Sequence, residues 1–416
     1  MQRTLALTIL VVAMAVLAPV AAAQQDGLVV VSPESHVPFF EYIAEQFEER
    51  YGVPLIIVSQ AYDLTHEVIV TAAAGGNTGF DVAVIDTIYV ANYALSGVVE
   101  PLDNFAGPEY FADFTESSMD MMTYNGRPYA LGGGYNYKYF YYNDRILREA
   151  GFTAPPRTWD ELVEMSRVIQ EKGLASYGIA WGWSQAEGLV ADFTLMLYAF
   201  GGEYQDAAGR WTINTPEARA ALQFMYDTMH TYGVADPAST SLSDREVLSL
   251  FMNGDVAFVI NWDFGWVWAR DPQRSRVVDD VRVALIPGTD RRVSATTGGG
   301  SGPAIMAGSQ KKDLAWGLLE LYVAPENQLG FLRDIESLRI TRQSLTGIPE
   351  LSEEPFRTMI EQQQYAYPRA KVAWYPQFSR TLQTEIHRAL TGQKPVEQAL
   401  ADAQAQIDRL ARQFER

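Results

Sequence analysis

Short apolar runs alternate with amphipathic stretches over the first ninety residues. An apolar run at 28–31 precedes a segment, 39–47, whose apolar residues recur at helical spacing. Two more apolar runs, at 53–59 and 80–86, are separated by another helical stretch. This β-α-β-α-β order predicts a mainly parallel sheet with helices on its faces. Ligands of such sheets bind at the carboxyl ends of the strands, so those ends are the first place to look for a site.

The rest of the chain continues the alternation. Further strand and helix patterns are predicted at 177–181 (strand), 217–233 (helix), 255–261 (strand), 281–286 (strand) and 395–414 (helix). The chain has no internal repeat and no long polar linker. We therefore expect an α/β protein whose parts are joined by short crossings.

The length and net charge of the chain limit the number of lobes and the kinds of ligand to expect. A chain of 416 residues exceeds what one hydrophobic core usually serves, so two lobes of roughly 150 to 200 residues are expected. The 32 Lys and Arg residues against 51 Asp and Glu residues give a net charge of −19. That charge argues against nucleic acid and against anionic membranes as partners. A neutral or cationic small ligand fits it better.

The N-terminal segment has the layout of a secretory signal peptide. Arg3 precedes an apolar run at 5–17, and small residues follow at 21–23. We expect cleavage after Ala23, because the apolar run is short for a retained membrane anchor. The sequence contains no cysteine, which excludes disulfides, thiol nucleophiles, thiolate metal sites and a lipid-carrying N-terminal cysteine. Export to a periplasm is the expected location.

Enzyme motifs are not evident. The four histidines show no metal-ligand spacing, and no nucleophile elbow or phosphate-binding loop is present. The sequence therefore predicts no catalytic residue, no metal site and no cofactor. Paired carboxylates of a glycoside hydrolase are set by folding and not by spacing, so that class stays open.

Aromatic residues gather where predicted strands end. Tyrosines crowd the stretch 135–142 directly after three glycines. Tryptophans cluster at the ends of the strands at 177–181 and 255–261, and a third cluster contains Trp374 and Tyr375. A sugar ring has an apolar face that stacks on aromatic rings and hydroxyl groups that need polar partners. These clusters therefore indicate a carbohydrate site, with packing in the core as the alternative.

Several of these segments resemble one known family. The segment "NGRPYALGGG" at 125–134 is followed by "FYYN" at 140–143 and by "PPRTWDEL" at 155–162. In this order they resemble the extracellular solute-binding proteins of ATP-binding-cassette (ABC) importers, in the carbohydrate branch that includes maltose- and trehalose-binding proteins. The likeness continues in order to the end of the chain. Where the family usually has proline, this chain has Gly132 to Gly134, which we interpret as a hinge or as room for a close ligand.

The resemblance implies a two-lobed periplasmic-binding-protein fold (type II-like), with a mainly parallel sheet in each lobe and a cleft between the lobes. The first lobe would comprise 28–131 plus 297–336, and the second 132–296 plus 337–416. It also implies a monomer that closes on its ligand by a hinge and delivers the ligand to the transmembrane subunits of a permease.

The predicted ligand contacts lie at strand ends and at the crossings. Polar contacts are expected from Glu34, Ser35, His36, Asp63, Asp86 and Asp263. Stacking contacts are expected from Tyr135, Tyr137, Trp181, Trp183, Trp262, Trp266 and Trp374. Gly299 and Gly300 would offer backbone N–H groups, as the resemblance implies. The expected ligand is a di- or oligosaccharide. A cationic ligand such as a polyamine or metal ion, and a secreted glycoside hydrolase, are the alternatives.

Overall fold

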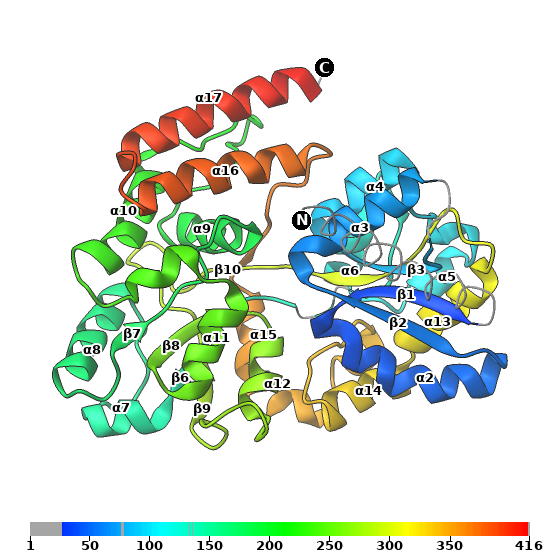
Figure 1. Cartoon of the computed structure of the whole chain (residues 1–416), viewed down its shortest axis with the longest axis horizontal. Coiled ribbons are helices and arrows are strands. Elements are labelled where there is room, and N and C mark those ends of the chain that lie inside the picture. The colour runs from blue at the N-terminus through cyan, green and yellow to red at the C-terminus, as the bar shows by residue number, and fades with distance from the viewer. Residues whose placement is uncertain (1–26, 76–78, 133, 135, 415–416) are drawn as a thin grey trace, which may run out of the picture. The chain divides into compact units, whose positions relative to one another are not determined.

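The computed structural model describes residues 27–75, 79–132, 134 and 136–414. The predicted signal peptide and Tyr135 lie outside the described residues. The described residues form two compact units, the first within the ranges 1–133 and 301–331, the second within 134–300 and 332–416. From the sequence, the crossings between the two lobes were expected at 131/132, 296/297 and 336/337. Each unit has its own sheet and its own surrounding helices (Figure 1).

The first unit is built on a four-stranded sheet in the order β11-β3-β1-β2. Its strands are β1 Leu28–Pro33, β2 Leu55–Gln60, β3 Val82–Asp86 and β11 Ser301–Ile305. β1 pairs in parallel with both β2 and β3, which confirms the predicted β-α-β-α-β order. β11 enters antiparallel to β3. A two-stranded hairpin joins β4 Thr123–Tyr124 to β5 Arg127–Pro128.

Helices of the first unit cover this sheet and bury its apolar residues. They are α2 Val37–Tyr51, α3 Tyr62–Ala74, α4 Val90–Ser96, α5 Pro108–Phe111, α6 Glu116–Met122 and α13 Lys312–Tyr322, with α14 Pro325–Asp334 crossing into the second unit. Phe39, Ile43 and Phe47 of α2 are all buried, as their helical spacing predicts. Gly52 ends that helix with a φ of 71°, a left-handed conformation that glycine adopts without strain.

The second unit is built on a sheet in the order β7-β8-β6-β9. Its strands are β6 Tyr139–Asn143, β7 Tyr177–Ile179, β8 Val256–Asn261 and β9 Val281–Ala284, with β10 Thr296–Thr297 and β12 Ala366–Tyr367 as a separate pair. Its helices are α7 Asp144–Ala150, α8 Trp159–Glu171, α9 Glu187–Ala199, α10 Pro216–His230, α11 Asp244–Asn253, α12 Phe264–Arg270, α15 Phe356–Gln363, α16 Tyr375–Leu390 and α17 Val396–Phe414.

The second sheet corrects one expectation. Only β7 and β8 are parallel, whereas β6 runs antiparallel to both β8 and β9, so this sheet is mixed and not mainly parallel. β6 enters this sheet directly after the first crossing and not after a helix of the same sheet, so no β-α-β unit sets its direction. As a result, the beginning of β6 lies beside the end of β8, with Tyr139 opposite Asn261. Along β6, Tyr141 is buried and Tyr142 is partly exposed, the alternation expected of a strand.

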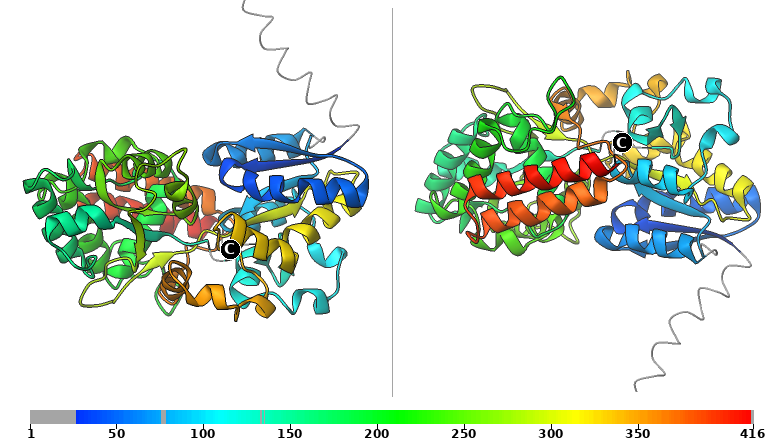
Figure 2. Two further views of the ribbon diagram at one scale, coloured as in Figure 1. Left: turned by 90° about the horizontal axis from the view of Figure 1, so that it is seen from below. Right: turned by 90° about the horizontal axis from the view of Figure 1, so that it is seen from above.

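The C-terminal helices α16 and α17 run side by side and pack on α10 and α9 of the same unit (Figure 2). The predicted terminal amphipathic helix is confirmed as α17, whose Leu400, Ala403 and Ile407 are buried. No helix in the described part of the chain is both long enough and apolar enough to cross a membrane.

Candidate functional site

In the first unit, the predicted polar residues gather at one edge of the sheet. β1, β2 and β3 are parallel, so their carboxyl ends meet at the same edge. Glu34 to His36 follow β1, Asp63 follows β2, and Asp86 ends β3. The antiparallel strand β11 begins at this edge, with Ser301 directly opposite Asp86.

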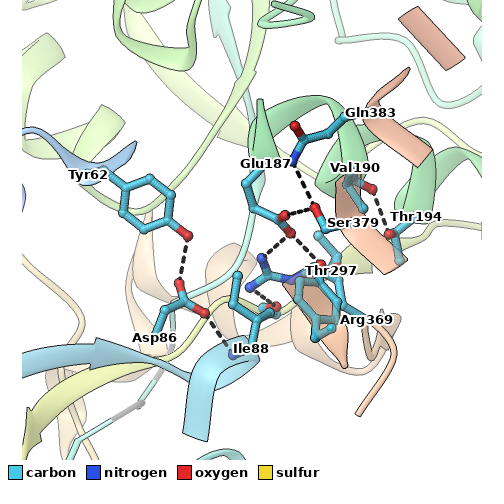
Figure 3. Close-up of polar contacts among 12 residues, drawn as sticks. Tyr62, Asp86, Ile88, Glu187, Val190, Thr194, Thr297, Arg369, Ser379 and Gln383 are labelled. Atoms are coloured by element: carbon cyan, nitrogen blue, oxygen red, sulfur yellow. Dashed lines mark hydrogen bonds and ion pairs between the residues drawn. The ribbon is translucent and has the colours of Figure 1, made fainter. Parts of the chain in front are cut away.

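The carboxylate of Asp86 is held in place by neighbours from three segments. The hydroxyl of Tyr62 donates to Oδ2 over 3.0 Å, and the backbone N–H of Ile88 donates to Oδ1 over 3.1 Å (Figure 3). The hydroxyl of Ser301 lies 3.5 Å from Oδ2. Asp86 is buried, so this hydrogen-bonded carboxylate is a fixed acceptor at the sheet edge.

A pocket of the first unit opens beside this carboxylate, and we call it the Asp86 pocket. It is lined by Pro33, Tyr62, Thr65, His66, Ile69, Val84, Ile85, Asp86, Tyr89, Tyr93 and Ser301. The His66 ring stacks on Tyr89 with 4.0 Å between ring centroids, and its Nδ1 lies 2.7 Å from the Tyr93 hydroxyl. Burial lowers the pKa of His66, which favours the neutral imidazole.

The other predicted residues of this unit differ in exposure. Glu34 and Asp63 are exposed at the sheet edge, where they are accessible to a ligand. His36 is buried with its ring edge-on to Phe39, and its Nδ1 lies 3.2 Å from the hydroxyl of Ser35. This arrangement is typical of a packed histidine.

The second unit has a comparable edge. β7 and β8 are parallel, and β6 runs the other way, so the ends of β7 and β8 meet the beginning of β6. Trp181 and Trp183 follow β7, Trp262 and Asp263 follow β8, and Tyr137 precedes β6. The strand directions thus bring the tyrosine cluster and two of the tryptophan clusters to one edge.

A buried lysine with two carboxylates lies under this edge. Nζ of Lys138 is 2.5 Å from Oδ1 of Asp192 and 3.0 Å from Oδ1 of Asp244. The side chains of Lys138 and Asp192 are 0% and 1% exposed, whereas Asp244 is 15% exposed. Burial alone lowers the pKa of Lys138, but the two carboxylates outweigh it and the net shift is upward. Burial raises the pKa of Asp192 to about 6, against the lowering effect of Lys138.

Trp262 is anchored by this cluster. Its indole N–H donates to Oδ2 of Asp244 over 2.9 Å, and Lys138 Nζ lies 5.3 Å from its ring. Arg369 lies 5.8 Å from the same ring. Gly299 packs against the ring so closely that an added Cβ would lie 2.5 Å from an indole carbon. Trp262 is only partly buried, so the edge presents a fixed aromatic surface.

Arg369 is fixed in turn by a buried acid. Its Nη1 lies 2.8 Å from Glu187, whose carboxylate also accepts from the hydroxyls of Tyr375 and Ser379 (Figure 3). Burial raises the pKa of Glu187, and Arg369 and the two hydroxyls lower it in part. Nη2 of Arg369 donates to the carbonyl of Gly298 over 3.2 Å, which ties the glycine-rich crossing to this cluster.

Several predicted contacts are engaged inside the unit. Trp181 and Trp183 are buried and stack on each other with centroids 4.7 Å apart. The carboxylate of Asp263 lies 3.0 Å from Nη2 of Arg339 in a buried ion pair, and burial raises its pKa. For Trp181, Trp183 and Asp263 these contacts are the ones expected of side chains packed inside the unit. Contact of these residues with a ligand stays a prediction.

The remaining predicted residues also have neighbours in the second unit. Trp266 is nearly buried and donates from its indole N–H to Glu336 over 3.1 Å. Trp374 packs among Trp211, Phe378 of α16 and Phe414 of α17. Tyr137 is buried and forms an isolated bridge with Gly298.

The two glycines predicted as backbone donors follow Gly298 in this crossing. The N–H of Gly299 donates to the carbonyl of Asn136 over 2.9 Å, so this donor is engaged within the unit, and its contact with a ligand stays a prediction. Gly300 is buried beside it. Gly299 therefore contributes by allowing Trp262 to pack closely, as its missing Cβ permits.

The sequence analysis did not predict the buried charged residues that lie at these sheet edges. Lys138 lies directly before the aromatic strand β6, and Asp192 lies in α9, a helix in which every residue except Gly188 is buried. A charge within an apolar segment needs a partner of opposite sign, and that signal could have identified both. Tyr62, His66 and Tyr89 could only be found from the fold, since nothing in their local sequence points to Asp86.

A metal site is not evident among the described residues. In the described ranges, no three or more His, Asp or Glu side chains are grouped so that they could hold a metal ion. The polar groups at both edges are instead acceptors and donors for hydrogen bonds beside aromatic rings.

Comparison with known proteins gives the family. Residues 33–329 match the family described as bacterial extracellular solute-binding protein. A candidate binding protein of Brucella abortus (strain 2308) is 25% identical over 309 residues, which are 74% of this chain and 73% of that protein. The maltotriose-binding protein of Pyrococcus abyssi is 26% identical over 232 residues, 55% of this chain and 47% of that protein.

A solved structure extends the likeness to nearly the whole chain. The maltose-bound protein of T. maritima is 30% identical, has a TM-score of 0.85, and covers 92% of this chain and 99% of its own. This agreement confirms the predicted α/β class and its two lobes, and it confirms the resemblance seen in the sequence. The chain therefore belongs to the bacterial extracellular solute-binding proteins.

Proposed function

We propose that this protein binds a sugar, in the range from disaccharide to short oligosaccharide, and delivers it to an ABC importer. The observation that carries the proposal is the partly exposed ring of Trp262, held by Asp244 at an edge that also contains buried charged groups. Support comes from similar proteins, because the T. maritima structure contains maltose and the Pyrococcus abyssi relative is named for maltotriose.

The chemistry of the two edges suits a carbohydrate. A ring fixed by hydrogen bonds stacks on the apolar face of a pyranose with little loss of side-chain entropy. Carboxylates such as Asp86, Asp63 and Glu34 accept hydrogen bonds from sugar hydroxyls, and such charge-assisted bonds are about twice as strong as neutral ones. Trp262, Asp86, Asp63 and Glu34 are accordingly the contacts we favour.

The delivery step completes the proposal. A ligand that contacts both units lowers the free energy of whichever arrangement allows both contacts, and this differential binding drives closure. Gly132 has a φ of 124° and fits the hinge assignment. The segment 1–23 would direct export to the periplasm, and the protein would act as a monomer beside a separate permease.

A thermal-shift panel tests the proposal. The full chain without residues 1–23 is heated with monosaccharides, disaccharides and oligosaccharides, and with spermidine and divalent cations as controls. A sugar at 100 times its Kd should stabilise the protein by about 2.7 kcal/mol, because it binds only the native state. A shift with spermidine or a metal ion and with no sugar would refute the sugar assignment. Release of a shortened product from an oligosaccharide would instead indicate a hydrolase.

A further inference from the structure

The Asp86 pocket is far smaller than a sugar ring. Its free volume is about 20 Å³, somewhat more than the roughly 10 to 15 Å³ that a single water needs. The pocket lies entirely within the first unit, between α3, the end of β3 and α4. A pyranose bound at this edge could therefore place only one substituent in the pocket.

The lining combines apolar walls with a single carboxyl group. Ile69, Val84 and Ile85 supply aliphatic surface, and the stacked pair of His66 and Tyr89 supplies aromatic surface. In the part of the chain that the structure describes, Asp86 is the one carboxylate that lines the pocket. A substituent that fits has an apolar carbon and one hydroxyl donor.

We propose that the Asp86 pocket takes the hydroxymethyl group of a sugar ring and so selects hexose units over pentose units. The methylene would lie against the aliphatic and aromatic walls, and the hydroxyl would donate to the carboxylate of Asp86. This inference rests on the proposed function, since it names the part of the sugar that this edge recognises.

An ammonium group is the competing occupant, and the pocket suits it less well. A primary ammonium brings three donors, whereas the pocket offers one carboxylate, which already accepts from Tyr62 and Ile88. The mostly apolar lining leaves the remaining ammonium donors without strong acceptors, and this carries a desolvation cost. Spermidine therefore serves as the test for this occupant.

Matched sugar pairs test the selectivity by calorimetric titration. The members of each pair differ only in hydroxymethyl groups or their hydroxyls: D-glucose with D-xylose, D-galactose with L-arabinose, cellobiose with xylobiose (which lacks the group on both rings), and maltose with 6′-deoxymaltose. For every pair that binds, the member with the intact hydroxymethyl should bind at least tenfold more tightly. A site that hydrogen-bonds a hydroxyl discriminates strongly against an analogue that lacks it.

Two variants assign the effect to the pocket. Asp86→Asn keeps the side-chain shape and an acceptor for Ile88 but removes the charge, so the affinity ratio should fall below threefold. Asp103→Asn, at an exposed ion pair of the same unit, should keep the wild-type ratio. The pairs measured on the unaltered protein decide the question even if Asp86→Asn does not fold.

Each outcome is decisive. Equal affinities within the pairs, tighter binding of the pentose member, or an unchanged ratio in a folded Asp86→Asn protein overturns the pocket assignment while sugar binding stands. Binding of spermidine that Asp86→Asn abolishes, with no sugar bound, overturns both this inference and the proposed function.

Discussion

Replacing Lys138 by methionine should destabilise the second unit strongly, and more at high pH than at low pH. Methionine fills a similar volume but leaves Asp192, which is 1% exposed, without its cation. The indole N–H of Trp183 at 3.0 Å would remain as a neutral donor to that carboxylate. Breaking a buried ion pair by removing one partner costs about 3 to 5 kcal/mol, because it leaves an uncompensated buried charge.

The pH dependence follows from the pKa of Asp192. Its folded value of about 6 lies above the ordinary value of 3.8, so between these values the native state binds more protons than the unfolded state. This group therefore favours the native state at low pH and loses that contribution as pH rises through 6. Without Lys138 the folded pKa rises further, so the variant should recover much of its deficit at pH 5 relative to pH 8.

Urea unfolding followed by tryptophan fluorescence measures this effect. Eight of the nine tryptophans lie in the second unit, and Trp316 is the exception, so the signal reports mainly the unit that holds Lys138. Lys394→Met is the matched control, since Lys394 also pairs with two carboxylates, Glu385 and Asp402, but is more exposed, and the buried Glu385 keeps Arg388 at 3.1 Å as a second cation. We expect a loss of about 1 kcal/mol or less there. A similarly small loss in Lys138→Met at pH 8, or a loss that does not depend on pH, would refute the reasoning.

Three further predictions concern the edges and the surface. Trp262→Ala should weaken sugar binding at least tenfold in a calorimetric titration. Trp268→Ala, in α12 where the ring packs on Phe264, should not, and equal effects would argue against stacking on Trp262. Gly299→Ala should displace the Trp262 ring, because the new Cβ would lie 2.5 Å from it, and an unchanged near-ultraviolet circular dichroism spectrum would contradict this. Arg127→Ala removes an exposed ion pair with Asp103 and should change the unfolding free energy by no more than about 1 kcal/mol, a limit that a larger loss in chemical denaturation would break.

The first sheet was predictable from the sequence because its strands and helices alternate along the chain in the same order in which they build the sheet. Apolar runs separated by helices leave parallel pairing as the simple solution, and the carboxyl ends then place Asp63 and Asp86 at one edge. The second sheet was harder, since β6 follows a crossing and not a helix of its own sheet. The direction in which such a strand enters depends on the path of the chain and not on its residue pattern.

The candidate site was predictable only in part. Trp183 and Trp262 both follow strands, yet one is buried against another tryptophan while the other is anchored at the edge by Asp244. Local sequence gives both the same pattern, and tertiary packing separates them. Likewise the partners of Lys138 lie 54 and 106 residues away, a distance over which spacing carries no information.

The most direct test of the central claim is a calorimetric titration of the protein, without residues 1–23, with the sugar that gives the largest thermal shift. The sugar should bind saturably at one site per chain and should be recovered unchanged after incubation. The absence of heat of binding with every sugar in the panel, or recovery of a cleaved sugar, would contradict a sugar-binding protein that carries its ligand to an importer.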